Sequence, residues 1–331
     1  MATLVTGSNG FAGINIVRKL AEAGESVVGL DNSPPSPDTH KFLGGLGEKV
    51  RFISADIVDS ERVLNIAKDN HIQRFVHAAA LTPTLEFEQS ETRRMLDVNL
   101  MGTVNVLEAA RKTSAIRFVF VSSSGVYGAP NDRKAVVKEN STLQLDKLYT
   151  ICKYSSELIV KRYSTLFGLS TVIGRMCAIY GPMEKVSTSR TNPSMIYKLV
   201  AALLAGQPVR ARGRDLVNDY THSQDAASIW SKLTLTKDLA HDTYNVSAGI
   251  AYSLADVLTT IQEIDENFSY EFVNYNEDAD VEITKDGERG ALDITRAKTN
   301  LDFVPKYDLK RGIQDYINWS KEYPNQSPMV G

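Results

Sequence analysis

The chain has 331 residues, enough for one large core or for a core with a smaller appended lobe. Hydrophobic residues make up 43% and charged residues 23%, which excludes a largely disordered protein. A net charge of −3 gives no general attraction to nucleic acid or to an anionic membrane. The chain has neither a basic signal-peptide start nor a bilayer-spanning apolar run, and Cys152 and Cys177 lack metal-ligand spacing. We therefore expect a soluble protein in the reducing cytoplasm.

The first half of the chain alternates short β-branched runs with helical stretches. The predicted strands are Ala2–Thr6, Ser26–Leu30, Val50–Ser54, Arg74–His77, Arg117–Val121 and Leu169–Ile173. The predicted helices are Phe11–Ala23, Glu61–Asn70, Glu91–Lys112 and Tyr149–Phe167. Strands that are apolar on both faces and separated by helices predict an α/β fold, a Rossmann doubly wound parallel sheet.

The regular alternation of predicted strands and helices ends after Gly181-Pro182. The polar segment Met183–Pro193 has no clear period and predicts a loop over a site. The remainder predicts a smaller C-terminal α/β lobe, with helices at Ser194–Ala205 and Ser253–Glu263 and short strands near Val209–Ala211 and Thr243–Asn245. We predict a nucleotide-binding domain at 1–175 and mainly a substrate-binding lobe at 176–331, with some segments returning to the first domain.

A glycine-rich turn follows the first predicted strand. Gly7 permits a tight turn, Gly10 lets the backbone approach a pyrophosphate, and Gly13 lets helix and strand pack closely. The helix N-terminus then points at the phosphates of a dinucleotide. Asn9 and Phe11 lie within the same turn and are predicted to contact the cofactor.

Asp31 ends the second predicted strand, at the distance from the turn where a ribose-binding acid is expected. Its carboxylate can accept hydrogen bonds from both adenosine ribose hydroxyls and would repel a 2′-phosphate. Since no arginine follows between Asn32 and Pro37, NAD is favoured over NADP. Asp56 and Ile57 follow the third strand and could hold the adenine edge, although an ordinary turn aspartate explains Asp56 nearly as well.

Hydroxyl groups follow the strand Arg117–Val121, where the ligand crevice of a parallel sheet is expected. Further along the chain, Tyr149 and Lys153 lie four apart and share one helix face. A nearby ammonium favours the tyrosine phenolate, so Tyr149 could exchange a proton with a substrate hydroxyl. A serine hydroxyl would polarise the same oxygen while hydride moves.

These features resemble the extended short-chain dehydrogenase/reductases, in particular the NAD-dependent epimerase/dehydratase family of the UDP-glucose 4-epimerase kind. The motifs occur in the family's order: TGSNGFAG, LDN at Leu30–Asn32, HAAA at His77–Ala80, VNLMGT at Val98–Thr103, the turn SSSGVYG, YTICK, IYGP at Ile179–Pro182, NDYTHSQDAA at Asn218–Ala227 and RGALDITRA at Arg289–Ala297.

The resemblance implies roles for individual residues. Ser123, four before Tyr127, would be the catalytic hydroxyl beside Tyr149 and Lys153, and Ser124 would lie near the substrate. Asn99 would lie on the cofactor side or serve as a helix-packing amide. Relatives usually dimerise through their two long helices, so we expect a homodimer. Cofactor contacts are expected at Gly7, Asn9, Gly10, Phe11, Gly13, Asp31, Asn32, Asp56, Ile57, Ala78, Ala79, Ala80, Asn99, Tyr149 and Lys153.

Departures from the family pattern narrow the chemistry. Gly125 stands where dehydratases usually carry an acid, which argues against elimination. Ala178 and Asn218 replace an asparagine and an arginine that nucleotide-sugar epimerases commonly direct at the diphosphate. Arg289 is the arginine best placed to compensate, and Thr82 is predicted to face the substrate, with a plain turn as the competing explanation.

The leading hypothesis is therefore an NAD-dependent epimerase of a sugar or nucleotide sugar that works through a transient keto intermediate. The alternative is an NAD-dependent dehydrogenase of a sugar, sugar acid or small polyol that releases its oxidised product. Either enzyme would act on a carbohydrate-like small molecule, with or without a nucleotide. No metal site, nucleic-acid partner or membrane partner is expected.

Overall fold

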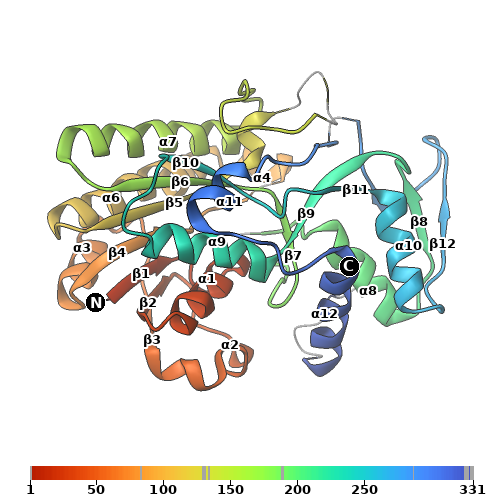
Figure 1. Ribbon diagram of the computed structural model, residues 1–331, viewed down its shortest axis with the longest axis horizontal. Coiled ribbons are helices and arrows are strands. Elements are labelled where there is room, and N and C mark those ends of the chain that lie inside the picture. The colour runs from red at the N-terminus through yellow and green to blue at the C-terminus, as the bar shows by residue number, and fades with distance from the viewer. Residues whose placement is uncertain are drawn as a thin grey trace.

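The computed structural model describes residues 2–82, 84–128, 132, 135–187, 190–285, 287–323 and 328. A seven-stranded sheet lies between two layers of helices, and a smaller lobe extends from one end of it, on the right of Figure 1. Pro83, and Thr188 and Ser189 of the predicted loop Met183–Pro193, lie outside the described residues.

The large sheet is parallel throughout and has the strand order β10-β6-β5-β4-β1-β2-β3. This arrangement confirms the predicted Rossmann-type α/β fold. The strands are β1 (Ala2–Thr6), β2 (Ser26–Asp31), β3 (Val50–Ser54), β4 (Ile72–His77), β5 (Arg117–Ser123), β6 (Thr171–Met176) and β10 (Thr243–Val246).

Helices cover both faces because successive strand residues point to opposite sides. Leu4 of β1 packs into the core under α3, α6 and α7, whereas Val5 packs into the core under α1 and α9. Both side chains are fully buried. The helices of these layers are α1 (Phe11–Glu22), α3 (Ser60–Asp69), α6 (Gly102–Lys112), α7 (Leu148–Phe167) and α9 (Ser223–Leu235).

The strand order reverses between β1 and β4, and a crevice is expected there at the carboxyl ends of the strands. The glycine turn follows β1 and the HAAA segment follows β4. These segments touch closely: a Cβ at Gly7 would come within 2.7 Å of the Ala79 backbone. The serine turn follows β5 at the same edge, so the topology brings the three predicted motifs together.

The smaller lobe is built on two three-stranded sheets, β11-β9-β7 and β12-β8-β13. Its strands are β7 (Ala178–Tyr180), β8 (Val209–Arg212), β9 (Val217–His222), β11 (Ala251–Ser253), β12 (Tyr270–Phe272) and β13 (Val281–Glu282). Its helices are α8 (Met195–Ala205), α10 (Leu254–Ile264) and α12 (Leu309–Glu322). The remaining helices are α2 (Pro37–Leu43), α4 (Leu85–Ser90), α5 (Thr92–Leu96) and α11 (Thr295–Leu301), with 3₁₀ turns at Gly44–Lys49 and Ser124–Tyr127.

Two predicted elements differ in detail. The helix expected at Glu91–Lys112 consists of α5, a π-helical turn at Asp97–Met101, and α6. The strand expected at Leu169–Ile173 begins two residues later, because Gly168 ends α7 with a left-handed conformation (φ 67°). Among the described residues, no helix combines the length and apolar character required to cross a bilayer.

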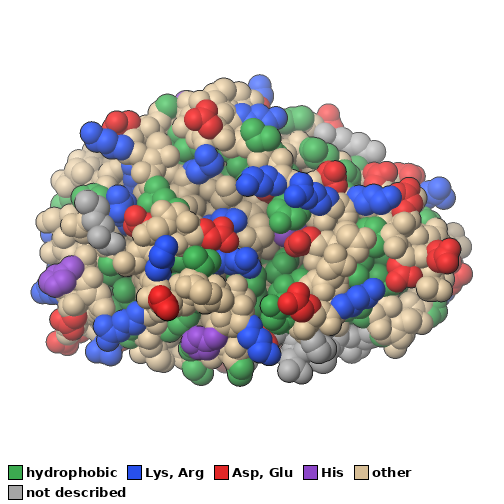
Figure 2. Space-filling model, turned by 60° about the horizontal axis from the view of Figure 1, so that its bottom comes forward, with side chains coloured by type: hydrophobic (Ala, Val, Ile, Leu, Met, Phe, Trp, Pro, Cys, Tyr) green, Lys and Arg blue, Asp and Glu red, His purple; other side chains and the backbone are tan. Residues whose placement is uncertain are grey.

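Figure 2 shows acidic and basic side chains interspersed over one face of the molecule. Acidic side chains gather toward its right-hand end, the end that carries the smaller lobe. Charged side chains of both signs therefore share this face.

Candidate active site

The glycine turn has the geometry of a phosphate cradle. Gly7 has φ +68°, and the Gly10 amide donates to the Gly7 carbonyl at 3.1 Å. A Cβ on Gly13 would lie 1.9 Å from that carbonyl oxygen, so only glycine allows α1 to start this close to β1. Gly10, the N-cap of α1, has no side chain to cap the first-turn amides, which leaves the positive end of the helix for an anion.

Asp31 lies against this turn. One carboxylate oxygen accepts from the Asn9 amide at 3.0 Å, and the other accepts from the Ser33 amide at 3.0 Å and the Ser33 hydroxyl at 2.8 Å. Asn9 Oδ1 is buried and has no partner within the described part of the chain. Asn32 is exposed beside this group. The cradle, the carboxylate and the orphaned amide oxygen together fit a dinucleotide.

The other predicted cofactor residues mostly shape the crevice. Asp56 accepts from the Val58 amide at 3.0 Å, as a turn aspartate does, and the buried Ile57 packs against Gly102. Asn99 pairs with the backbone of Leu81, accepting from its amide at 2.8 Å and donating to its carbonyl at 3.0 Å. The π-helical turn therefore presents Asn99 to the segment Ala78–Leu81 and holds it in place.

Ser123, Tyr149 and Lys153 meet at the end of β5. Ser123 Oγ accepts from the Gly125 amide at 3.0 Å. Lys153 Nζ donates to the Val121 carbonyl at 2.8 Å and lies 5.9 Å from the centre of the Tyr149 ring. The position of Lys153 four residues after Tyr149 on α7 places both groups on the face that packs on β5.

Burial changes the proton affinities of this group. Burial raises the pKa of Tyr149 to about 12, against the opposing effects of a hydrogen bond with Ser123 and the charge of Arg190. Burial lowers the pKa of Lys153 to about 8. Burial therefore sets the direction of the shift for Tyr149, and the role of Lys153 in favouring its phenolate stays a prediction.

His77 is a packed residue at the end of β4. Its Nδ1 lies 2.7 Å from Thr6 Oγ1 and its Nε2 lies 3.0 Å from Thr103 Oγ1. Burial and the Lys153 charge lower the pKa of His77 to about 3, so the ring is neutral near pH 7. Within the described ranges, no group of three or more His, Cys, Asp or Glu side chains is arranged to hold a metal ion.

The predicted substrate residues border the crevice on the side of the smaller lobe. Ser124 and Arg289 line one small cavity together with Tyr127, Asn218 and Asp219. Arg289 donates to the Glu288 carbonyl at 2.8 Å, and Thr82 forms a β-bridge with Arg190. A larger cleft of about 610 Å³ continues past Ala178 and Asn218 toward Asn192, Lys198 and Tyr220. The two substituted positions, Ala178 and Asn218, therefore line the cleft.

The structure also shows what the sequence pattern missed. Glu184 is fully buried and holds Arg190 at 2.6 Å, together with the amide and hydroxyl of Ser194 at the start of α8. Glu157 pairs with Arg175 behind the serine turn. The four-residue spacing of Tyr149, Lys153 and Glu157 could have indicated the Glu157–Arg175 pair. No local pattern indicates the Glu184–Arg190 pair.

Comparisons with known proteins agree with this site. Residues 3–247 match the NAD dependent epimerase/dehydratase family. The chain is 29% identical to a putative UDP-glucose 4-epimerase of Methanocaldococcus jannaschii over 96% of this chain and 98% of the relative. The UDP-glucose 4-epimerase of Thermotoga maritima, solved with UDP-glucose, superposes with a TM-score of 0.81 at 23% identity, covering 98% of this chain and 100% of that one.

A dTDP-glucose 4,6-dehydratase from Bacillus anthracis, solved with NAD, superposes with a TM-score of 0.79 at 22% identity, covering 98% of both chains. Epimerases and dehydratases thus share this fold, and the fold alone does not choose between them. The chain belongs to the NAD-dependent epimerase/dehydratase family. The resemblance drawn from the motifs is confirmed, as are the enzyme class and the cofactor, NAD.

Proposed function

We propose that this enzyme is an NAD-dependent epimerase of a sugar or nucleotide sugar. The observation that carries the proposal is the meeting of Ser123, Tyr149 and Lys153 beside the dinucleotide cradle, with Gly125 where an eliminating acid would stand. A Cβ at Gly125 would approach the Ser123 hydroxyl to 3.2 Å. An acidic side chain at this position would therefore crowd the serine as well as change the chemistry.

The chemistry follows from the positions of these groups. Ser123 donates a hydrogen bond to the reacting oxygen, and Tyr149 takes the proton of that hydroxyl. NAD, when bound, would be held by the glycine turn and Asp31 and would supply the hydride acceptor and donor. Tyr149 gives the proton back to the same oxygen, and Lys153 stabilises the phenolate in between. With the hydride supplied back to the other face of the sugar, the product would be the epimer, and no oxidant would be consumed.

The state of the purified protein tests this proposal. An epimerase is expected to retain NAD through purification and to interconvert epimers without added cofactor. A dehydrogenase would instead reduce external NAD, seen as growing absorbance at 340 nm with stoichiometric product. That second result would replace the proposal with the alternative.

Tyr149→Phe tests the assignment of the proton-transferring group. Its kcat is expected to fall by about 10²- to 10⁴-fold with NAD still bound, because general acid–base catalysis contributes that much. Tyr163→Phe on the same helix is the matched control, since the Tyr163 hydroxyl contacts Glu108 away from the site. Unchanged turnover in Tyr149→Phe would overturn the mechanism.

The substrate class is the open part of the proposal. The names of the relatives support a nucleotide-linked sugar, whereas Ala178 and Asn218 lack the side chains that would grip a diphosphate. A thermal-shift screen of matched sugars with and without a nucleotide decides between the two. Stabilisation by nucleotide sugars alone would assign the larger cleft to the nucleotide.

We also propose a domain boundary at residue 175, a cytoplasmic location and a homodimer. Helix α7 exposes Ile151 (41%) and Leu158 (51%) seven residues apart, and Met101 of the neighbouring π-helical turn is 47% exposed. This apolar face supports pairing of two subunits through the long helices. Analytical ultracentrifugation of the wild type and of Leu158→Lys tests it, and a monomeric wild type would exclude it.

A further inference from the structure

A buried ion pair lies behind the serine turn. The side chains of Glu157 and Arg175 are 1% and 5% exposed, and Arg175 Nη2 lies 2.7 Å from Glu157 Oε2. The Arg175 Nε also donates to Glu157 Oε1 at 3.0 Å. A buried pair adds little net stability, because removing both charges from water offsets much of their attraction. Stability alone therefore does not account for its position.

Glu157 connects the strand of the serine turn to the helix of the catalytic pair. Ser122 Oγ, immediately before Ser123, donates to Glu157 Oε1 at 2.5 Å. Glu157 lies four residues after Lys153 on α7, so it occupies the same helix face. One carboxylate thus fixes the end of β5 relative to Tyr149 and Lys153.

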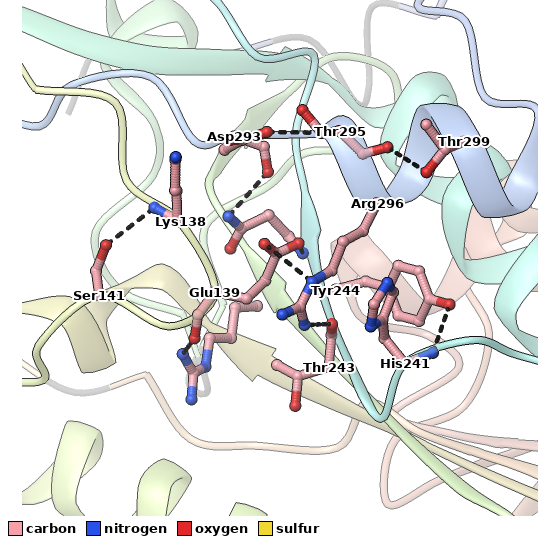
Figure 3. A network of polar contacts seen from close by, with 12 residues as sticks. Lys138, Glu139, Ser141, His241, Thr243, Tyr244, Asp293, Thr295, Arg296 and Thr299 are labelled. Atoms are coloured by element: carbon pink, nitrogen blue, oxygen red, sulfur yellow. Dashed lines mark hydrogen bonds and ion pairs between the residues drawn. The ribbon is translucent and has the colours of Figure 1, made fainter.

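Arg175 extends these contacts to Tyr127 and to Glu139. Its guanidinium lies 4.9 Å from the centre of the Tyr127 ring, and its Nη1 donates to the Glu139 carbonyl at 3.0 Å. The Glu139 carboxylate accepts from the Asn245 amide at 3.0 Å, and Asn245 Oδ1 accepts from the Tyr127 hydroxyl at 2.6 Å. Figure 3 shows Glu139 within this network, near Arg296 and the β10 residues Thr243 and Tyr244.

We propose that Glu157 and Arg175 are positioning residues for the reaction. The pair holds the serine turn in place against α7, and the Glu157 carboxylate supplies the negative charge that keeps Lys153 in its ammonium form. This inference rests on the proposed function in one respect, since it assigns the two residues to the same hydride-transfer site.

The charges around Lys153 support the second part of the inference. Burial lowers the pKa of Lys153 to about 8, while Cys152 and Glu157 on its own helix act to raise it. From β4, His77 faces Lys153 as a neutral ring, and Tyr149 faces it from the preceding turn of α7. Glu157, paired with Arg175, is thus the carboxylate that raises the proton affinity of Lys153.

Glu157→Gln tests both parts because it preserves the shape of the side chain and removes its charge. We expect kcat to fall by up to about 10²-fold with little change in KM, since a small displacement of a catalytic group has that effect. The high-pH limb of activity should move to lower pH, because the ammonium loses its proton more easily. Glu108→Gln is the control, since Glu108 pairs with Arg111 on α6 and should leave the pH profile unchanged.

A direct titration separates this inference from the proposed function. The lysine 13Cε resonance that is missing in a Lys153→Ala sample reports the ionisation of Lys153 without any substrate. Its pKa should be lower in Glu157→Gln than in the wild type. A wild type without epimerase activity would overturn the proposed function, whereas an unshifted Lys153 titration would overturn the electrostatic role of Glu157.

Ser122→Ala separates position from charge and guards against a Glu157 variant that does not fold. It removes one hydroxyl contact and leaves the ion pair intact. We expect its kcat to fall at unchanged KM while the Lys153 titration stays at its wild-type value. The positioning role would be overturned if Ser122→Ala kept the wild-type kcat and any folded Glu157→Gln kept it as well.

Discussion

The cofactor end and the smaller lobe differ in the groups that determine their structure. At the cofactor end, the backbone makes the site: glycines that tolerate no Cβ, free helix amides, and a carboxylate tied to the turn. In the lobe, charged side chains pair across short strands, as Arg210 does with Glu271 and Glu277, and Arg212 with Glu282. Backbone geometry leaves few sequences that fit, whereas surface ion pairs are easily exchanged. The cofactor can therefore be predicted from the amino-acid sequence, whereas the substrate is much harder to predict from it.

The largest expected effect comes from Gly13→Ala. The new methyl group would lie 1.9 Å from the Gly7 carbonyl, so α1 must shift away from the phosphate cradle. We expect loss of retained NAD and a destabilisation of about 1–3 kcal/mol, as overpacking costs elsewhere. Retained NAD after gel filtration and the urea midpoint measure these two effects. Gly45→Ala is the control, because nothing lies within 4 Å of its added methyl; equal NAD content in both variants would contradict a backbone-built site.

Asp31→Asn should have the next largest effect. Loss of a charged acceptor for ribose hydroxyls costs about 1.5–3 kcal/mol, which is roughly 10- to 100-fold in NAD affinity. Discrimination against NADP should weaken at the same time. Asp56→Asn gives a comparison, since Asp56 is an aspartate of the turn after β3 and makes no contact with the glycine turn among the contacts described above. Calorimetric titration with NAD and NADP measures both, and a larger loss in Asp56→Asn would reverse the assignment of the ribose acid.

His77 should make the large sheet sensitive to acid. Its pKa is lowered to about 3 from 6.5, so the unfolded chain binds one more proton between these values. The stabilisation is present above pH 6.5 and is lost as pH falls toward 3. One proton of this kind costs about 2 kcal/mol between pH 7 and pH 5. Urea unfolding at both pH values measures the loss, and His77→Gln, which cannot titrate, should show a smaller one.

The smallest effect is expected in the lobe. Arg210→Gln removes a side chain that is 40% exposed and pairs with Glu271 and Glu277. Such pairs contribute about 0.2–1 kcal/mol, so the thermal midpoint should change little and KM should not change. A rise in KM without a change in stability would show that Arg210 contacts substrate, and would weaken the contrast drawn between the two regions.

Much of the cofactor half could be predicted because its signals are local. The spacing of Gly7, Gly10 and Gly13 and the helix pattern around Tyr149 and Lys153 reflect contacts within a few turns of chain. The Glu184–Arg190 clamp was missed because a buried carboxylate in a polar loop has no periodic signal. The π-helical turn was also missed, because the apolar pattern predicts a helix without distinguishing π-helical from α-helical hydrogen bonding.

Strand β10 completes the parallel sheet from residues 243–246, far along the chain from its neighbour β6. During synthesis the first six strands therefore emerge before their seventh, and the free edge of β6 stays open while the intervening lobe is made. Helix α9 covers α1 only at the same late stage. A ribosome-bound chain that ends near residue 175 should consequently present an aggregation-prone edge, and proteins that stop there should depend on a chaperone.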